Sequence, residues 1–332
     1  MENCLKVTAS PHIQDNSSTR KLMLNVIIAL LPCVVASTII FGLNTLLLCG
    51  VTVAACVVFE WLYCRLMKKP NPVGDLSAVV TGLILALNMP VSMPLWIAVV
   101  GAFIAIVITK QLFGGIGMNF ANPALVARIV LFTGFASRMT AFVNPPKAVR
   151  TLQIMGVDGA SSATPLQVEG GVGKYPLMDL FMGVHGGVMG ETCAMAILIG
   201  LAWLLVTRTI TATIPVTYVG SYALFSFLLN VGELGAADAG MLVLHEVLAG
   251  GLLFGAVFMA TDYVTSPFTL KGKIVFGIGL GLITFGIRAF GNMAEGVSYA
   301  ILLMNLFVPY INDLTRQVPL GYKKHKKGAE KA

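Results

Sequence analysis

The sequence predicts an all-α polytopic membrane protein of about ten transmembrane helices, arranged as two inverted five-helix repeats. Three observations predict this fold class. Hydrophobic residues make up 57% of the chain and charged residues only 11%, whereas soluble domains average roughly 45–50% and about 25%. Apolar runs of spanning length recur along the whole chain. One short residue pattern also occurs in each half, five predicted spans apart.

The predicted spans are apolar runs of about 17–25 residues, or shorter runs interrupted by Pro or Gly. In the first half they cover residues 22–42, 45–64, 76–89, 94–112 and 123–136. In the second half they cover residues 191–207, 211–230, 246–260, 274–290 and 297–309. A longer polar stretch separates the two sets, so the sequence predicts two five-helix units joined by a large loop.

The distribution of basic residues predicts the orientation, because cytoplasmic loops carry an excess of Lys and Arg. With the N-terminus inside, sixteen of the 22 basic residues fall in predicted cytoplasmic segments, five fall outside, and Arg128 falls within a span. The predicted units are therefore a cytoplasmic segment, a first repeat, an extracytoplasmic loop, a second repeat and a basic cytoplasmic tail: residues 1–21, 22–136, 137–190, 191–313 and 314–332. Both termini are expected in the cytoplasm, and the net charge of +7 reflects this topology rather than nucleic-acid binding.

The repeat is visible in two thirteen-residue segments that align without gaps. Residues 82–94 read GLILALNMPVSMP, and residues 255–267 read GAVFMATDYVTSP. Each segment is followed by an apolar helix and a turn that contains Gly and Asn. Because an odd number of spans separates the copies, they are expected to enter the membrane from opposite sides, as in transporters whose broken helices meet near the midplane.

Conventional catalytic and metal-binding patterns are not found in the sequence. The six cysteines include no C-x-x-C pair, and most fall inside apolar runs, so they are expected to be buried thiols rather than metal or iron–sulfur ligands. The four histidines are scattered without a nucleophile beside them. We therefore predict no catalytic residue and no metal site, and we expect any redox centre of this chain to be organic.

The first candidate site is a polar loop in the predicted extracytoplasmic segment. Its residues follow the pattern D-x-x-S-x-A-T, which places Asp158, Ser161 and Ala163 before Thr164. Small neighbours are expected to leave the threonine hydroxyl exposed and sterically open. The alternative is an ordinary Ser/Gly/Pro turn between helices.

Two further segments combine flexible backbone with polar side chains at the ends of predicted spans. Residues 114–124, GGIGMNFANPA, place the amides of Asn119 and Asn122 beside three glycines, an arrangement suited to a neutral, hydrogen-bonding ring system. In the second half, Asp262 lies between Thr261 and Thr265, and these oxygens suit an ion path or cofactor contacts. Plain helix-capping loops are the alternative for both segments.

Three charged residues in or near the predicted spans are given no substrate role. Lys110 and Arg128 are expected to extend to the inner surface of the membrane. Glu60 lies late in the second predicted span and is expected close enough to that surface to be hydrated.

Together these motifs resemble one family of membrane subunits. The D-x-x-S-x-A-T segment resembles the motif to which an FAD-dependent flavin transferase attaches FMN. The segments at 114–124, 259–267 (M-x-T-D-x-x-T-S-P) and 295–305 (E-G-V-S-Y-A-x-L-x-M-N) are similar to the D subunit of Rnf complexes and its paralogue, the B subunit of Na⁺-pumping NADH:quinone reductase. The resemblance covers nearly the whole chain, and the short N-terminus favours the Rnf subunit. Ser162 departs from the motif, which usually has Gly there.

The resemblance implies a urea-transporter-like fold of ten helices in a prokaryotic inner or plasma membrane. It also implies FMN bound to Thr164 through a phosphoester at the outer face, and riboflavin held non-covalently near Asn119 and Asn122. The expected partners are other Rnf subunits, which carry the ferredoxin and NAD⁺ sites, and the flavin transferase during maturation. The implied function is electron relay coupled to Na⁺ or H⁺ translocation. Alternatives are a channel or secondary transporter for a small solute, and a structural scaffold.

Overall fold

The computed structural model describes residues 18–70, 72–143, 161–162, 164–166, 173, 175–291 and 296–317. Each of the ten predicted spans coincides with helix over most of its length. The first half and the start of the polar stretch contain α1 (Thr19–Phe41), α2 (Asn44–Leu66), η1 (Val73–Asp75), α3 (Ser77–Leu87), α4 (Leu95–Phe103), the π-helix η2 (Ile104–Gln111), α5 (Pro123–Gly134), α6 (Ala136–Met139) and β1 (Phe142–Val143).

The connection between the halves contains the two-residue strand β2 (Ser161–Ser162), which pairs with β1 in an antiparallel ladder, and the short helix α7 (Leu177–Met182). The second half contains α8 (Ala194–Val206), α9 (Thr213–Leu234), α10 (Ala236–Leu248), α11 (Leu252–Phe254), the π-helix η4 (Gly255–Met259), α12 (Leu270–Phe290) and α13 (Val297–Leu314).

Five of the described helices are long and apolar enough to cross a membrane, or six if the bent pair formed by α10 and α11–η4 counts as one span. Four shorter apolar helices of 10–17 residues lie between them. The chain is therefore a multi-pass, mainly helical membrane protein. The ten-span count, the inverted relation of the halves and the likeness to urea transporters remain predictions.

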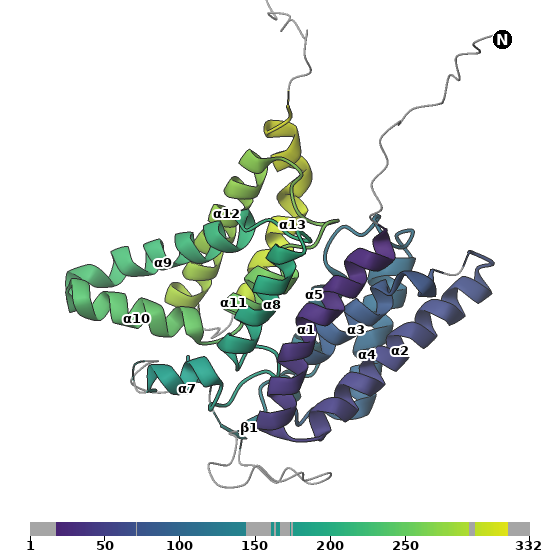
Figure 1. Cartoon of the computed structure of the whole chain (residues 1–332), viewed down its shortest axis with the longest axis horizontal. Helices are drawn as coiled ribbons and strands as arrows, with labels where there is room; N and C mark the ends of the chain where they lie inside the picture. Colours follow the sequence, from purple (N-terminus) through teal and green to yellow (C-terminus); the bar gives the residue numbers. More distant parts are fainter. Residues whose placement is uncertain are drawn as a thin grey trace, which may run out of the picture.

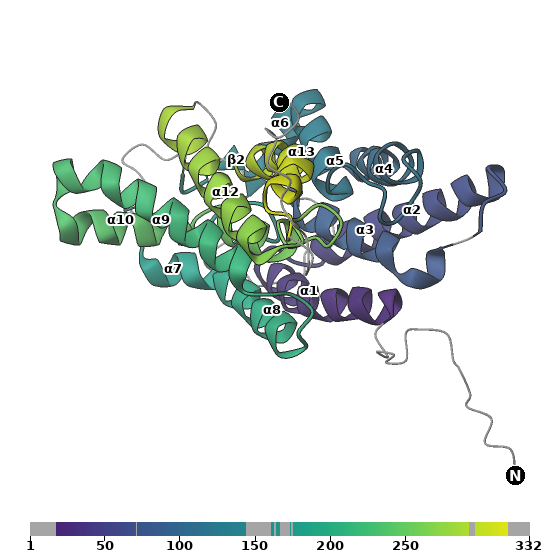
Figure 2. The same cartoon turned by 90° about the horizontal axis from the view of Figure 1, so that it is seen from above.

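The halves occupy opposite sides of the molecule (Figure 1), with α1 to α5 on one side and α9 to α12 on the other. Helix α1 packs against α8, and α5 packs against α13, so the halves meet along both pairs. The start of α1 and the end of α13 lie at one end of the bundle, and β1 lies at the other. Seen from above in Figure 2, α2 and the α9–α10 hairpin project in opposite directions.

The span predicted at residues 246–260 is wrong in its boundaries. Helix α10 ends at Leu248, and a new helix starts at Leu252, bent by 63° from the first. The break falls at Gly250, whose φ of +71° lies in the left-handed region, where glycine carries no steric penalty. The sequence pattern also missed most of α10, because its charged and small residues are not those of a continuous apolar run.

The outer surface is apolar, as a lipid environment requires. On α1, Leu31, Val35 and Ile39 are spaced four residues apart and are about half exposed, at 48%, 56% and 58%. A water-soluble protein would turn such a stripe inward. The same helix buries small side chains such as Ala29 and Cys33 beside larger apolar ones, and small residues in helix–helix contacts are typical of a bundle packed in lipid.

The contact between α9 and α12 depends on glycine. A Cβ atom added at Gly277 would lie 1.9 Å from Oγ1 of Thr217, and one added at Gly281 would lie 2.0 Å from Oγ of Ser221. Small residues at matched positions let two backbones approach closely, which maximises van der Waals contact. Ser221 also donates a hydrogen bond to the carbonyl of Gly277, at 3.2 Å. These contacts hold α9 close against α12.

Candidate functional site

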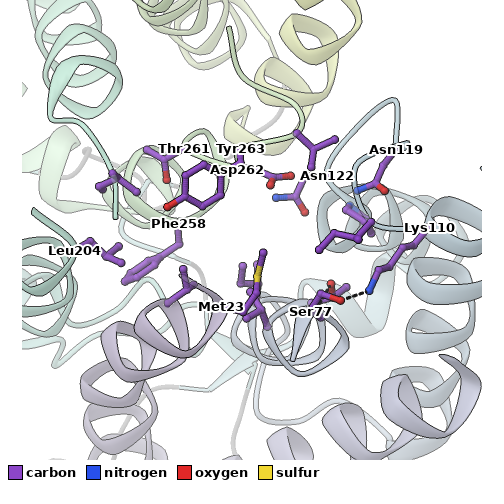
Figure 3. Close-up of a pocket in the computed structure, with 18 of the residues that line it drawn as sticks. Met23, Ser77, Lys110, Asn119, Asn122, Leu204, Phe258, Thr261, Asp262 and Tyr263 are labelled. Carbon is purple, nitrogen blue, oxygen red and sulfur yellow. Dashed lines mark hydrogen bonds between the residues drawn. The ribbon is translucent and has the colours of Figure 1, made fainter. Parts of the chain in front are cut away.

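A cavity between the two halves brings together residues from segments that are far apart in the sequence. Helices α1 and α3 form one side, the 116–123 segment another, and η4 with the turn that follows it a third. Figure 3 shows Lys110 and Ser77 on one side of this pocket and Phe258 and Leu204 on the other. The pocket contains the two asparagines predicted for a cofactor, together with Thr261 and Asp262.

The asparagine segment has the flexible backbone that its glycines predict. Gly114, Gly115 and Gly117 have φ values of +122°, +96° and +89°, which non-glycine residues rarely adopt. The segment ends where Asn122 caps α5: its Oδ1 accepts a hydrogen bond from the backbone N–H of Ala124, at 3.1 Å.

The two amides line the same pocket and differ in the group that is left without a partner. Because Oδ1 of Asn122 is engaged in the cap, its NH₂ group is the part left to donate to a ligand. Asn119 is half-buried, and its Oδ1 has no hydrogen-bond partner among the described residues. A donor and an acceptor therefore line the same cavity, and such a pair matches a ring edge with alternating N–H and C=O groups.

Asp262, predicted in one cluster with Thr261 and Thr265 for an ion path or cofactor contacts, lies on the side of the pocket that the second half forms. Asp262 follows the π-helix η4, and its Oδ2 accepts a hydrogen bond from Oγ1 of Thr265, at 3.2 Å. Thr261 lines the pocket but donates its hydroxyl to the carbonyl of Val257, at 2.6 Å. Thr265 is buried outside the pocket lining. The carboxylate of Asp262 is thus the acidic group of this cluster that faces the cavity.

Both π-helices contribute to this pocket. Lys110 comes from the last turn of η2, and Val257 and Phe258 come from η4. A π-helical turn widens the backbone ring and leaves an i→i−4 hydrogen bond unmade, so it is uncommon and is frequently found at functional sites. The occurrence of one such segment in each half, both bordering one cavity, marks the pocket as the candidate functional centre.

The expectation that Lys110 extends to the membrane surface is wrong. Its side chain is 3% exposed, and its Nζ donates to Oε1 of Glu60 at 2.6 Å and to Oγ of Ser77 at 2.5 Å. Glu60 is fully buried, so its predicted hydration is wrong as well. Nε2 of Gln111 donates to the same Oε1, at 2.8 Å. The four residues form a buried polar network beside the pocket, because a charge within a lipid-embedded bundle requires a partner.

Arg128 also points inward rather than toward the membrane surface. Its Nη1 donates to Oδ1 of Asn88 and to Oγ of Ser298, both at 2.9 Å. Asn88 caps the end of α3 and Ser298 lies in the first turn of α13, so this arginine links the two halves of the molecule. Sequence reasoning missed this role, although the signal was available: an ionisable residue inside an apolar run is a functional candidate by default.

Thr164 lies away from this pocket, on the connection between the halves. It is only 2% exposed, and its Oγ1 has no hydrogen-bond partner among the described residues. The expectation of an exposed, open hydroxyl is therefore wrong. Ser161 lies in β2, opposite Val143 of β1. Asp158 and Ala163, the other predicted motif residues, lie outside the described residues.

The segment that carries Thr164 is anchored by Leu166. This side chain packs with Leu180 and Ala249 in a small apolar cluster. A Cβ added at Gly250 would lie 2.8 Å from Cδ1 of Leu166 and 3.1 Å from Nη2 of Arg288. The break between α10 and α11 therefore brings Leu166 close to a partly buried cationic side chain, and only glycine fits between them.

Comparison with known proteins gives a consistent result along the whole chain. A model of the NQR2, RnfD, RnfE family matches residues 6–321. The chain is 43% identical, over 98% of both sequences, to the D subunit of the Na⁺-translocating ferredoxin:NAD⁺ oxidoreductase complex of Acetobacterium woodii. It is 34% identical to the D subunit of the proton-translocating ferredoxin:NAD⁺ oxidoreductase complex of Clostridium ljungdahlii, over 97% of this chain and 98% of the relative. It is 36% identical to the D subunit of an ion-translocating oxidoreductase complex of Stutzerimonas stutzeri, over 94% of each.

Proposed function

This chain belongs to the NQR2, RnfD, RnfE family, and on that premise we propose that it is the electron-relay membrane subunit of an ion-translocating oxidoreductase complex. Electrons would pass from reduced ferredoxin to NAD⁺, coupled to the movement of Na⁺ or H⁺, as the names of its relatives state for their complexes. The ferredoxin and NAD⁺ sites would be on other Rnf subunits. The buried, unpartnered hydroxyl of Thr164 is the observation on which the cofactor part of this proposal depends.

Thr164 would carry FMN as a phosphoester on Oγ1. A buried hydroxyl without a hydrogen-bond partner is costly, and among the described residues this one has none. Esterification replaces the hydroxyl hydrogen with phosphorus, so no donor remains to be satisfied. FMN, when bound, supplies a ring system that accepts and passes on electrons. The covalent bond keeps that group from dissociating.

Burial of Thr164 has a consequence for maturation. At 2% exposure, its Oγ1 is closed to an enzyme of the flavin-transferase kind. The segment held by Leu166 would therefore be modified before it packs, or it would open for modification. In this reading Asp158 and Ser161, with Ala163, are recognised by the transferase and take no part in electron transfer.

The pocket between the halves would hold the second flavin, riboflavin, without a covalent bond. Asn119 offers an unpartnered carbonyl oxygen, and Asn122 offers an NH₂ group. Those two groups complement the imide edge of a flavin ring, which carries one N–H between two carbonyls. Asp262 lines the same pocket, and we propose it, with Thr261 and Thr265, as part of the ion path.

Substitution of Thr164 tests the covalent cofactor. The complex, co-expressed with the flavin transferase, is denatured, and flavin fluorescence is read in the gel. Wild type is expected to give a fluorescent band at this subunit, and Thr164→Val is expected to give none. Thr207→Val serves as the control, since Thr207 lies at the end of α8 far along the chain from the motif. A wild-type subunit without fluorescence would sink the covalent-flavin proposal.

A channel or secondary transporter for a small solute is the competing function, and the cavity between the halves favours it over a plain scaffold. A transporter has no use for a modified Thr164. It therefore predicts solute uptake by reconstituted wild type that Thr164→Val leaves unchanged. A scaffold predicts that both Thr164→Val and Asp262→Ala leave electron transfer unchanged.

A further inference from the structure

We propose that Lys110 is a tethered cation that alternates between the carboxylate of Glu60 and negative charge in the pocket, so that Glu60 binds a Na⁺ or H⁺ whenever Lys110 turns to the pocket. The inference rests on the proposed function, because it needs a redox group in the cavity. It assigns a cation-binding role to Glu60 and a coupling role to Lys110.

The geometry places one ammonium within reach of both sites. Nζ of Lys110 lies 2.6 Å from Oε1 of Glu60 and 2.5 Å from Oγ of Ser77. Lys110 and Ser77 both line the pocket, and Figure 3 shows the bond between them at its edge. Glu60 lies behind this edge and does not line the pocket. A lysine ends in a compact charge on a flexible four-carbon stem, so a rotation of that stem redirects the charge without moving a helix.

The carboxylate of Glu60 has an oxygen available to bind a cation other than Lys110. Its side chain is fully buried, and its Oε2 has no hydrogen-bond partner among the described residues. Oε1 also accepts from Nε2 of Gln111, at 2.8 Å. Oγ of Ser77 is a further oxygen near the pair. If Lys110 turns away, the buried carboxylate loses its counter-charge, and an unpaired buried charge is strongly disfavoured. Uptake of Na⁺ or H⁺ restores neutrality.

Charge and electrons balance in the proposed cycle. One electron from the complex's ferredoxin side adds one negative charge to the pocket. Lys110 turns from Glu60 to that charge, and Glu60 takes one Na⁺ or H⁺ from the aqueous phase. When the electron leaves toward NAD⁺, Lys110 returns to Glu60, and the cation is released. One cation is therefore bound and released for each electron that passes.

Other titratable groups around the pair are few among the described residues. Cys56 and Cys64 on α2 lie close enough to interact with Glu60 and Lys110. Asp75 in η1 accepts a hydrogen bond from Oγ of Ser77, at 2.5 Å. Asp262 borders the pocket from the second half. Of these acidic groups, Glu60 is the one that Lys110 contacts directly. Substitutions of Glu60 and Lys110 therefore separate the effect of this pair on the flavin potential from the effect of the other titratable groups.

The test is a potentiometric titration of the non-covalent flavin in the purified complex, at several pH values and Na⁺ concentrations. Wild type is expected to show a midpoint potential that rises with the concentration of the coupling cation. Glu60→Gln is expected to raise the potential, because Lys110 then stays with the pocket. It is also expected to abolish the Na⁺ dependence and Glu60's share of the pH dependence, whereas the pH dependence from protonation of the flavin itself stays in every variant. Lys110→Met is expected to lower the potential.

The double variant, Lys110→Met with Glu60→Gln, keeps the test decisive if Lys110→Met alone fails to assemble. It removes both charges together, and it is expected to keep a potential near that of Na⁺-free wild type at the same pH, with no Na⁺ dependence and only the pH dependence of the flavin itself. Lys271→Met, which removes an exposed lysine in the first turn of α12, is the control and should leave the titration unchanged.

Three results would overturn the inference. One is a Glu60→Gln variant that keeps the full cation dependence, and another is a double variant that does so. The third is a wild type without non-covalent flavin, a result that also overturns the riboflavin part of the proposed function. A wild type that binds the flavin but whose variants keep the wild-type dependence refutes the inference alone.

Discussion

The ammonium of Lys110 lies 2.6 Å from Oε1 of Glu60, although the two residues are 50 positions apart in the sequence. The contact joins η2 to α2 inside the first half. Two opposite charges in a lipid-embedded bundle offset each other's loss of hydration. If one of them is removed, the other is left unpaired and destabilises the fold. The pair therefore fixes how these two elements pack.

Removal of one charge of this pair should destabilise the protein more than removal of both. Lys110→Met leaves Glu60 buried without its counter-charge, and we expect a loss of about 3–5 kcal/mol in the free energy of unfolding. The double variant with Glu60→Gln should recover most of that loss. The free energy of unfolding of each purified complex in detergent is the measurement that compares the single and double variants. Equal losses in the single and double variants would contradict it.

Asn119→Leu should release the non-covalent flavin and leave the covalent adduct in place. Asn119 lines the pocket, and the substitution removes its unpartnered Oδ1, so a buried flavin N–H would lose its proposed acceptor. Flavin extracted by acid precipitation should fall relative to wild type, while in-gel fluorescence from Thr164 stays constant. Unchanged extracted flavin would show that the second flavin is bound elsewhere.

Asp262→Asn should slow ion-coupled turnover several-fold. The substitution keeps the shape of the side chain and a partner for Thr265, but it removes the negative charge that attracts a cation to the pocket. Ion uptake by the reconstituted complex should fall, whereas the flavin content should match that of wild type. Loss of flavin together with transport would show that Asp262 is a cofactor contact instead.

Gly277→Ala should weaken the packing of α9 against α12. The new Cβ would lie 1.9 Å from Oγ1 of Thr217 and 2.8 Å from its Cβ, and overpacking of this kind costs about 1–3 kcal/mol. Gly286→Ala, on the same helix, is the matched control, because a Cβ there meets nothing within 4 Å. The melting temperature should fall for the first variant and hold or rise for the second. A fall of equal size in both would indicate a general effect of replacing helical glycine.

Helix positions followed from the sequence wherever one apolar run formed one helix. Composition and run length require helices in a membrane, since only a closed hydrogen-bonded backbone is stable in lipid. The predicted span at residues 22–42 thus matches α1 (Thr19–Phe41) closely. The break at Gly250 escaped prediction, because the residues on both sides are apolar and a glycine alone does not reveal a bend of 63°.

For the candidate site residues, too, the sequence predicted some properties correctly and others wrongly. Asn119, Asn122 and Asp262 were found from the sequence because polar side chains beside glycine or at a helix end interrupt an apolar pattern, and the structure brings all three to one pocket. The exposure of Thr164 was predicted wrongly, because it depends on what packs around Leu166.

The sequence by itself determined that the chain is a helical membrane protein, and it determined the family to which the chain belongs, because composition and motifs are local properties. Only the tertiary structure decided the partners of its charges. Glu60 and Lys110 look like residues near the membrane surface when each is considered within its own helix. They become a buried pair when η2 packs on α2. The two residues are 50 positions apart in the sequence, and they pair because a single unpaired charge in the low-polarity interior of the bundle is strongly destabilising.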